Sequence, residues 1–247
     1  MAFARLASRV EFEPLVRVHV WELPVRLAHW TIVFSIVVLS FTGWYLHEPF
    51  TTELREQAWT MATMRFIHVV TAFAFSLAVL VRVTWFFVGN RWAYWRAFVP
   101  VTRSHLRSMG AMLRYYLFLR WRAPEAVGHN RLAALTYLVV YALLLLQVIT
   151  GFALYGWIGT QPWAWLFGWV QHLIPIQYVR ELHYFLMFMF FGFTIHHVYS
   201  ALLVAAEEKN GLMGSIVSGD KFIAADQLRR DMQDDAPSGA MAARRMS

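Results

Sequence analysis

Histidines are the residues of this 247-residue chain whose number and spacing could support metal chemistry. The chain has ten of them and no cysteine. The absence of cysteine excludes disulfides, iron–sulfur clusters held by this chain, covalently attached c-type haem and a cysteine nucleophile. Any metal or cofactor that the chain binds must therefore be held mainly through imidazole.

Four histidines fall at two matched depths of long apolar segments, where a ligand-capable residue marks a functional site by default. His68 and His183 stand near the outer starts of two segments that run inward. His29 stands near the inner start of another, and His197 follows His183 by 14 residues, which rise about 21 Å along a helix. The sequence therefore predicts an outer pair, His68 with His183, and an inner pair, His29 with His197. Two stacked bis-histidine haems require this arrangement, and both axial positions of each iron would then be filled.

Helical phase distinguishes the neighbouring histidines of the last segment. At 100° per residue, His183 and His197 lie about 40° apart on one face, whereas His196 lies roughly 140° away. His197 is therefore the candidate ligand, although its adjacency to His196 leaves a swap open. The same 14-residue step places Arg82 on the His68 face at the inner level, where a haem propionate is a candidate anion for it.

Arginines recur one helical turn before three of the four candidate ligands. Each lies three residues earlier in the chain and closer to the membrane surface. Because propionates point towards water, such arginines are well placed to pair with them; snorkelling at a helix end is the alternative. The pairs are Arg26 with His29, Arg65 with His68, and Arg180 with His183.

His129 and Asn130 form a candidate quinone site. They lie at the cytoplasmic mouth of the third apolar segment, at the depth of the inner histidine pair. An imidazole there could bind a quinone carbonyl and deliver its proton. In the competing interpretation Asn130 caps the helix and His129 lies in the loop, and the two can hold together.

The composition indicates that these residues are positioned by membrane-spanning helices. Hydrophobic residues make up 59% of the chain and charged residues 15%, against about 45–50% and 25% in soluble domains. Four segments reach the ~20 residues that a span needs. They cover approximately residues 27–46, 66–88, 132–156 and 183–206. We expect an all-α, integral-membrane four-helix bundle.

The distribution of basic residues predicts the topology. Arginines and lysines concentrate before the first span, between the second and third, and after the fourth, so both termini and the 2–3 connection are expected in the cytoplasm. Such a distribution of basic residues explains the net charge of +7 better than nucleic-acid binding does. Residues 105–121 predict an amphipathic helix on the inner surface, and 163–174 a short interfacial helix on the outer side. We expect one domain over residues 1–225 and a disordered cytoplasmic tail over 226–247.

At these positions the chain closely resembles the b-type cytochrome subunit of membrane-bound nickel–iron hydrogenases, over nearly all residues up to about 222. The matching stretches are Trp21–Trp30, Arg65–His68, Phe87–Arg91, Tyr116–Leu119, Gly128–Asn130, Ile149–Tyr155 and His197–Tyr199. Two departures stand out. The family usually has Gly where His196 stands, and often has a further His where Arg180 stands.

The resemblance implies two haems b, ligated at His29, His68, His183 and His197. It also implies a quinone pool as acceptor and a hydrogenase docked on the outer face of a bacterial inner membrane. Hydrogen chemistry would belong to the partner's iron–sulfur small subunit and large subunit. The cytochrome subunit of formate dehydrogenase or another periplasmic oxidoreductase is the alternative. An intramembrane-histidine metal transporter is less well supported, because no predicted span has an acidic residue in its interior.

Overall fold

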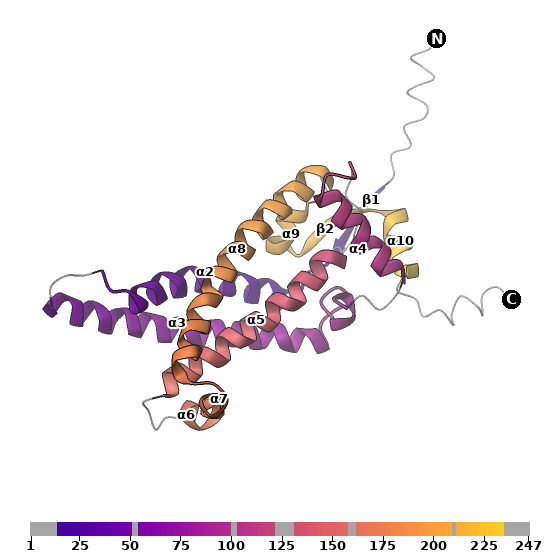
Figure 1. Ribbon diagram of the computed structural model, residues 1–247. Helices are drawn as coiled ribbons and strands as arrows, with labels where there is room; N and C mark the ends of the chain where they lie inside the picture. Colours follow the sequence, from indigo (N-terminus) through magenta and orange to yellow (C-terminus); the bar gives the residue numbers. More distant parts are fainter. Residues whose placement is uncertain are drawn as a thin grey trace, which may run out of the picture.

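The computed structural model describes residues 14–50, 54–99, 103–121, 131–157, 162–208 and 211–234, and these are mostly helical (Figure 1). The elements are β1 (Leu15–His19), α2 (Leu23–His47), α3 (Leu54–Val88), the 3-10 helix η1 (Trp95–Ala97), α4 (Arg103–Tyr116), α5 (Arg131–Gly156), α6 (Pro162–Phe167), α7 (Trp169–Leu173), α8 (Ile176–Glu208), α9 (Leu212–Ser218), β2 (Asp220–Ala224) and α10 (Ala225–Asp234).

Four of these helices are long and apolar enough to cross a membrane, which confirms the predicted four-helix membrane bundle. The candidate spans are Leu23–His47, Trp59–Val88, Leu132–Gly156 and Ile176–Glu207. The helices exceed the predicted spans chiefly at the N-terminal ends of α3 and α8. Hydropathy locates only the part of a helix that is apolar enough for hydrocarbon, whereas backbone hydrogen bonding continues through polar first turns.

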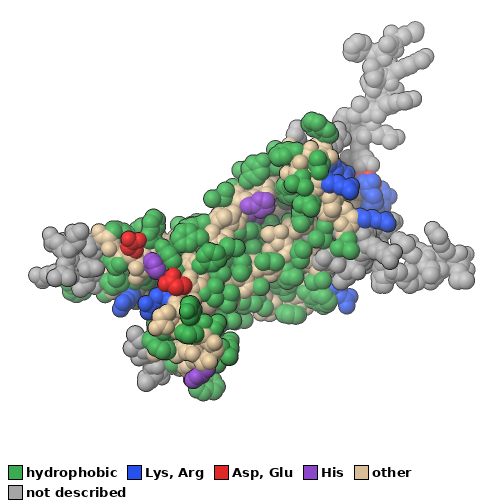
Figure 2. Space-filling view, viewed as in Figure 1, with side chains coloured by type: hydrophobic (Ala, Val, Ile, Leu, Met, Phe, Trp, Pro, Cys, Tyr) green, Lys and Arg blue, Asp and Glu red, His purple; other side chains and the backbone are tan. Residues whose placement is uncertain are grey.

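The bundle core lies where α2, α3, α5 and α8 meet. Its buried residues are Ala28, Ile32, Phe75, Ala78, Val79, Leu144, Leu186 and Phe190. Large apolar side chains also cover the outside, as Figure 2 shows for one face, where Lys and Arg gather towards the ends. Phe34, Leu77 and Ile195 are each more than 60% exposed. Such a surface would be a liability in water and is suited to lipid.

The two predicted short helices are present, with different boundaries. The amphipathic helix is α4, which buries Met112 and exposes Leu113. It ends at Tyr116, before the predicted limit of 121, because Phe118 adopts the left-handed conformation at φ 59° and closes the helix. The outer helix is divided into α6 and α7 at Gly168.

A small β-ribbon adds to the predicted all-α architecture. Strand β1 pairs antiparallel with β2, from Leu15 opposite Ala224 to His19 opposite Asp220. The Asp220 carboxylate accepts hydrogen bonds from the Arg17 guanidinium and lies 2.8 Å from His19 Nδ1. The bond from Arg17, and then that to His19, holds the pKa of Asp220 below its ordinary value. The ribbon thereby ties the segment before α2 to the segment after α9.

The prediction of disorder from residue 226 is wrong for the first part of the tail. Residues 225–234 form α10, which packs against β2. An ion pair of 2.7 Å joins Arg230 to Asp226 one turn earlier. The low apolar content of residues 226–234 is typical of a disordered tail, but α10 follows directly on the paired strand β2, which fixes the position of its first residue. Residues 235–247 lie outside the described part of the chain.

Candidate functional site

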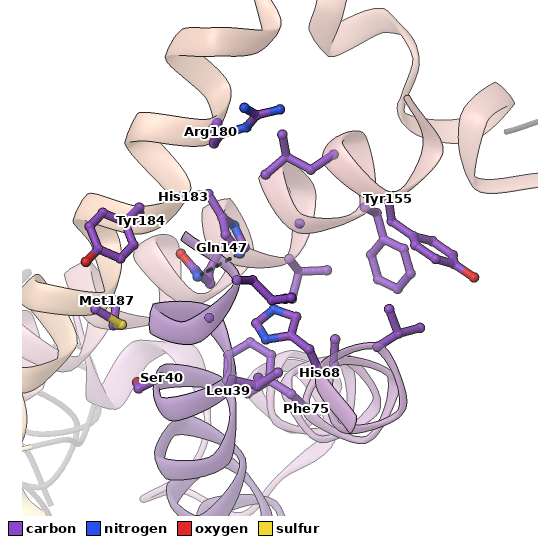
Figure 3. Close-up of a pocket in the computed structure, with 18 of the residues that line it drawn as sticks. Leu39, Ser40, His68, Phe75, Gln147, Tyr155, Arg180, His183, Tyr184 and Met187 are labelled. Atoms are coloured by element: carbon purple, nitrogen blue, oxygen red, sulfur yellow. Dashed lines mark hydrogen bonds between the residues drawn. The ribbon is translucent and has the colours of Figure 1, made fainter. Parts of the chain in front are cut away.

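A cavity of 790 Å³ opens among α2, α3, α5 and α8 and contains the predicted outer histidine pair. His68 comes from α3 and His183 from α8, and both rings are directed into the cavity (Figure 3). Its volume falls within the range of about 300–1,000 Å³ typical of cofactor and ligand sites. The remaining lining is mainly apolar, with Phe75, Met187 and Phe190 at the side of the bundle core.

A threonine from a neighbouring helix contacts each histidine of this cavity. The Thr42 hydroxyl on α2 lies 2.8 Å from His68 Nδ1, and the Thr150 hydroxyl on α5 lies 2.9 Å from His183 Nδ1. Both threonines are 2% exposed. Each ring is therefore fixed at its Nδ1 side, so that its other nitrogen is the one available to a ligand.

A glycine follows each of these threonines and allows the helix backbone to approach the ring. A Cβ at Gly43 would lie 3.3 Å from His68 Cε1, and a Cβ at Gly151 would lie 3.1 Å from His183 Cε1. Both distances are tighter than ordinary van der Waals contact. The Thr-Gly pairs thus hold the two imidazoles in matching positions.

The two halves of the cavity share a sequence pattern. A Thr-Gly pair on one helix is followed, on a helix packed in the same bundle, by Arg-x-x-His. Arg65 and Arg180 are the arginines of this pattern, and both line the cavity. The signal was present in the sequence as two Thr-Gly pairs and two Arg-x-x-His runs, but different spacings between them hide the relationship.

Gln147 is a further cavity residue that the sequence analysis missed. Its amide nitrogen lies 3.3 Å from His183 Nε2 (Figure 3), and its amide oxygen is buried without a hydrogen-bond partner among the described residues. An uncharged amide inside an apolar span gives only a weak sequence signal. Its contact marks His183 Nε2 as a nitrogen with an available lone pair.

The predicted inner pair is also brought together. The ring centres of His29 on α2 and His197 on α8 lie 6.4 Å apart, with the ring planes inclined by 58°. Two imidazole nitrogens that bind one metal at about 2.0–2.1 Å each place their ring centres about 6 Å apart. The spacing of these rings therefore suits one metal ion between them. His29 Nδ1 is buried and has no hydrogen-bond partner in the described structure.

The surroundings separate His197 from its neighbour His196. His197 stacks on Phe193 at 5.4 Å, and its Nδ1 lies 3.2 Å from the Tyr137 hydroxyl. His196 is exposed and lies 3.4 Å from the Ser200 hydroxyl. The structure thus places His197, and not His196, beside His29, as the helical phase predicts.

Arg82 is buried in an aromatic box near the inner pair. Its guanidinium carbon lies 4.8 Å from the ring centres of Phe86 and Tyr141 and 5.3 Å from that of Phe98. Its Nε donates to the Tyr141 hydroxyl at 2.8 Å, while Nη1 is buried with no partner in the described structure. A buried cation with a free donor is a good partner for an anionic group.

Arg26 has a different environment from the other predicted propionate contacts. Its guanidinium donates to the Val217 carbonyl of α9, and its Nε is buried without a described partner. The start of α2 is also tied to the end of α3, because the Glu22 carboxylate accepts hydrogen bonds from the Asn90 backbone at 2.8 Å and from Trp85 at 3.2 Å. These contacts fix the helix that carries His29.

The predicted quinone residues, His129 and Asn130, lie outside the described residues. Among the described ones, no group of three or more His, Cys, Asp or Glu side chains could hold a metal ion. The two histidine pairs therefore offer two protein ligands each. A pair of imidazoles suits an iron whose other four ligands come from a porphyrin.

Comparisons with known proteins identify the family. Residues 20–219 match the family described as prokaryotic cytochrome b561. The chain is 36% identical over 209 residues to a probable Ni/Fe-hydrogenase B-type cytochrome subunit of Cupriavidus necator, covering 81% of this chain and 85% of the relative. It is 35% identical over 219 residues to the corresponding protein of Azotobacter vinelandii, covering 85% of this chain and 90% of the relative. It is 30% identical over 212 residues to a probable Ni/Fe-hydrogenase 1 B-type cytochrome subunit of Escherichia coli K12, covering 81% of this chain and 89% of the relative. The chain belongs to the prokaryotic cytochrome b561 family.

Proposed function

We propose that this chain is a diheme cytochrome b that passes electrons from a periplasmic nickel–iron hydrogenase through the membrane to quinone. The observation that carries the proposal is the pairing of four histidines within one bundle. His183 and His197 stand on the same helix, about 21 Å apart along its axis, and each has a histidine partner from another helix.

The residues present fit two haems b. His68 and His183 would hold one group in the 790 Å³ cavity, and His29 and His197 the other. Haem iron with two imidazole ligands supplies one-electron transfer and offers no open position to oxygen. Arg65 and Arg180 would bind propionates of the first group, and the free donor of Arg82 a propionate of the second. The Nε of Arg26, which has no partner among the described residues, could serve the same purpose.

The donor is inferred from the relatives and from what the chain lacks. The names of the relatives assign those proteins to Ni/Fe hydrogenases. With no cysteine, this chain cannot hold the iron–sulfur clusters that deliver electrons, so these belong to the hydrogenase small subunit, and hydrogen oxidation belongs to the large subunit. Trp157, which lines the cavity, is exposed, as are Trp165 of α6 and Trp169 of α7. Exposed tryptophans suit the outer lipid interface or a docked protein.

The acceptor end is assigned to the His29–His197 end of the bundle. Helix α5 begins at Arg131, and Tyr137 in its second turn contacts His197. The segment containing His129 and Asn130 immediately precedes that helix and would bind the quinone and supply its protons from the cytoplasm. By the positive-inside rule, both termini lie in the cytoplasm. A hydrogenase in the periplasm would place the protein in the bacterial inner membrane. Carrying an electron inward corresponds to about 2.3 kcal/mol per 100 mV of membrane potential.

Reconstitution with the partner enzyme tests this function. Co-purified chain and hydrogenase in liposomes should reduce quinone when supplied with hydrogen, and His197→Ala should abolish this while His196→Ala should retain it. Wild-type complex that oxidises hydrogen with an artificial acceptor but never reduces quinone would refute the proposal. Co-purification with formate dehydrogenase in place of hydrogenase would select the alternative partner.

A further inference from the structure

The hydroxyl protons of Thr42 and Thr150 are already committed to their own helices. Thr42 Oγ1 donates to the Val38 carbonyl at 2.8 Å, and Thr150 Oγ1 donates to the Leu146 carbonyl at 2.8 Å. A hydroxyl has one proton and two lone pairs. Because the proton is used within the helix, each oxygen faces the adjacent histidine as a hydrogen-bond acceptor.

This requirement fixes the protonation pattern of both imidazoles in the cavity. At 2.8 Å and 2.9 Å, Nδ1 of His68 and of His183 must carry the hydrogen that the threonine accepts. Nε2 is then unprotonated in each neutral ring. A second contact agrees for His183, because the Gln147 amide nitrogen, which can only donate, lies 3.3 Å from its Nε2.

We propose that Thr42 and Thr150 are matched positioning residues that select Nε2 of His68 and His183 as axial ligands and lower the reduction potential of that haem. This rests on the proposed function. A histidine ligand whose other nitrogen donates a hydrogen bond is more basic and has a fixed ring orientation. A more basic ligand stabilises ferric over ferrous iron, so two such bonds make this haem a stronger reductant.

The inner pair lacks this matched arrangement. His197 Nδ1 contacts a phenol at the longer distance of 3.2 Å, and His29 Nδ1 is buried without a described partner. The ligands of the His29–His197 haem are therefore less strongly polarised, and its potential is expected to be higher. This difference in reduction potential favours electron flow from the His68–His183 haem to the His29–His197 haem, which is the direction of quinone reduction.

The test uses the purified full-length protein with its haems. Thr42→Val and Thr150→Val keep the side-chain shape and remove the acceptor, whereas Thr42→Ser and Thr150→Ser restore it. Thr84→Val is the matched control, because Thr84 makes the same bond to the carbonyl four residues earlier, at 2.9 Å, but contacts no histidine in the described structure. Potentiometric titration followed by visible spectra, and the ferric low-spin electron paramagnetic resonance signal, are measured for each variant.

Each Val variant should shift one haem couple to higher potential and alter one low-spin signal, leaving the other haem unchanged, and the double variant should shift it further. The Ser variants and Thr84→Val should match wild type. A Val variant could instead lose haem, with its haem affinity falling by about 10–100-fold. Haem binding that recovers in the corresponding Ser variant then supports the role of the hydroxyl, whereas haem loss in both the Val and the Ser variant overturns it. Unchanged potentials and signals in haem-loaded Val variants also overturn it. Wild-type protein without haem b would instead refute the proposed function.

Discussion

Replacing Gly151 by Ala should weaken the His68–His183 haem site, although alanine is the better helix former. In an open helix interior, Gly to Ala gains about 0.5–1 kcal/mol. The new Cβ would lie 3.1 Å from His183 Cε1, so the ring must move by a few tenths of an ångström. It cannot do so freely, because Thr150 holds its Nδ1 at 2.9 Å. Overpacking of this kind costs about 1–3 kcal/mol, which leaves a net loss of up to about 2.5 kcal/mol.

The matched control is Gly192→Ala on α8, where a Cβ would meet no atom of the described residues within 4 Å. Thermal unfolding of the haem-loaded protein in detergent, together with haem retained after gel filtration, compares the two variants. Gly192→Ala should be as stable as wild type or slightly more stable, while Gly151→Ala should unfold at lower temperature and lose one haem preferentially. Equal stability and full haem content in both variants would show that the close approach at Gly151 has no energetic consequence.

Two further changes test the elements around the site. Tyr141→Phe removes the acceptor of Arg82 Nε, so that Nε joins Nη1 as a donor of this 3% exposed arginine without a partner in the described structure. The free energy of unfolding should fall by about 1–3 kcal/mol, and unchanged thermal stability would contradict this prediction. The β-ribbon should loosen in acid. The pKa of Asp220 is lowered in the folded protein. The stabilisation that its ionised carboxylate gives the folded ribbon is therefore complete above the ordinary pKa of 3.8 and is lost as the pH falls through the folded-state pKa. The protection of residues 15–19 against hydrogen exchange, corrected for the intrinsic exchange rate at each pH, should fall there. Asp220→Asn should abolish that fall, and an unchanged protection profile in the variant would exclude the ion pair as its cause.

The parts of the fold set by local pattern could be predicted from the sequence. Apolar length located the four spans, and the 14-residue separation of His183 and His197 predicted which histidines share a face. The structure then brings His197 next to His29 and leaves His196 exposed. These inferences succeed because helix geometry converts sequence spacing directly into depth and direction.

The features that the sequence did not reveal depend on contacts between distant segments. Strands β1 and β2 pair residues about 200 positions apart, and a strand of five residues alone does not specify a partner. Thr42 and Thr150 each make an ordinary bond within their own helix, so their contact with a histidine emerges only when the helices pack. Such residues carry no charge and no metal-ligand chemistry of their own.

The most direct test of two histidine-ligated haems is haem quantification by pyridine haemochrome and reduced-minus-oxidised spectra on the purified chain. The wild type should contain two haems b per chain. His183→Ala and His197→Ala should each lose one haem, spectrally distinct from the other, and His196→Ala should retain both. Absence of haem b from the wild type would contradict the account outright, and loss of a haem in His196→Ala but not in His197→Ala would reassign the ligand.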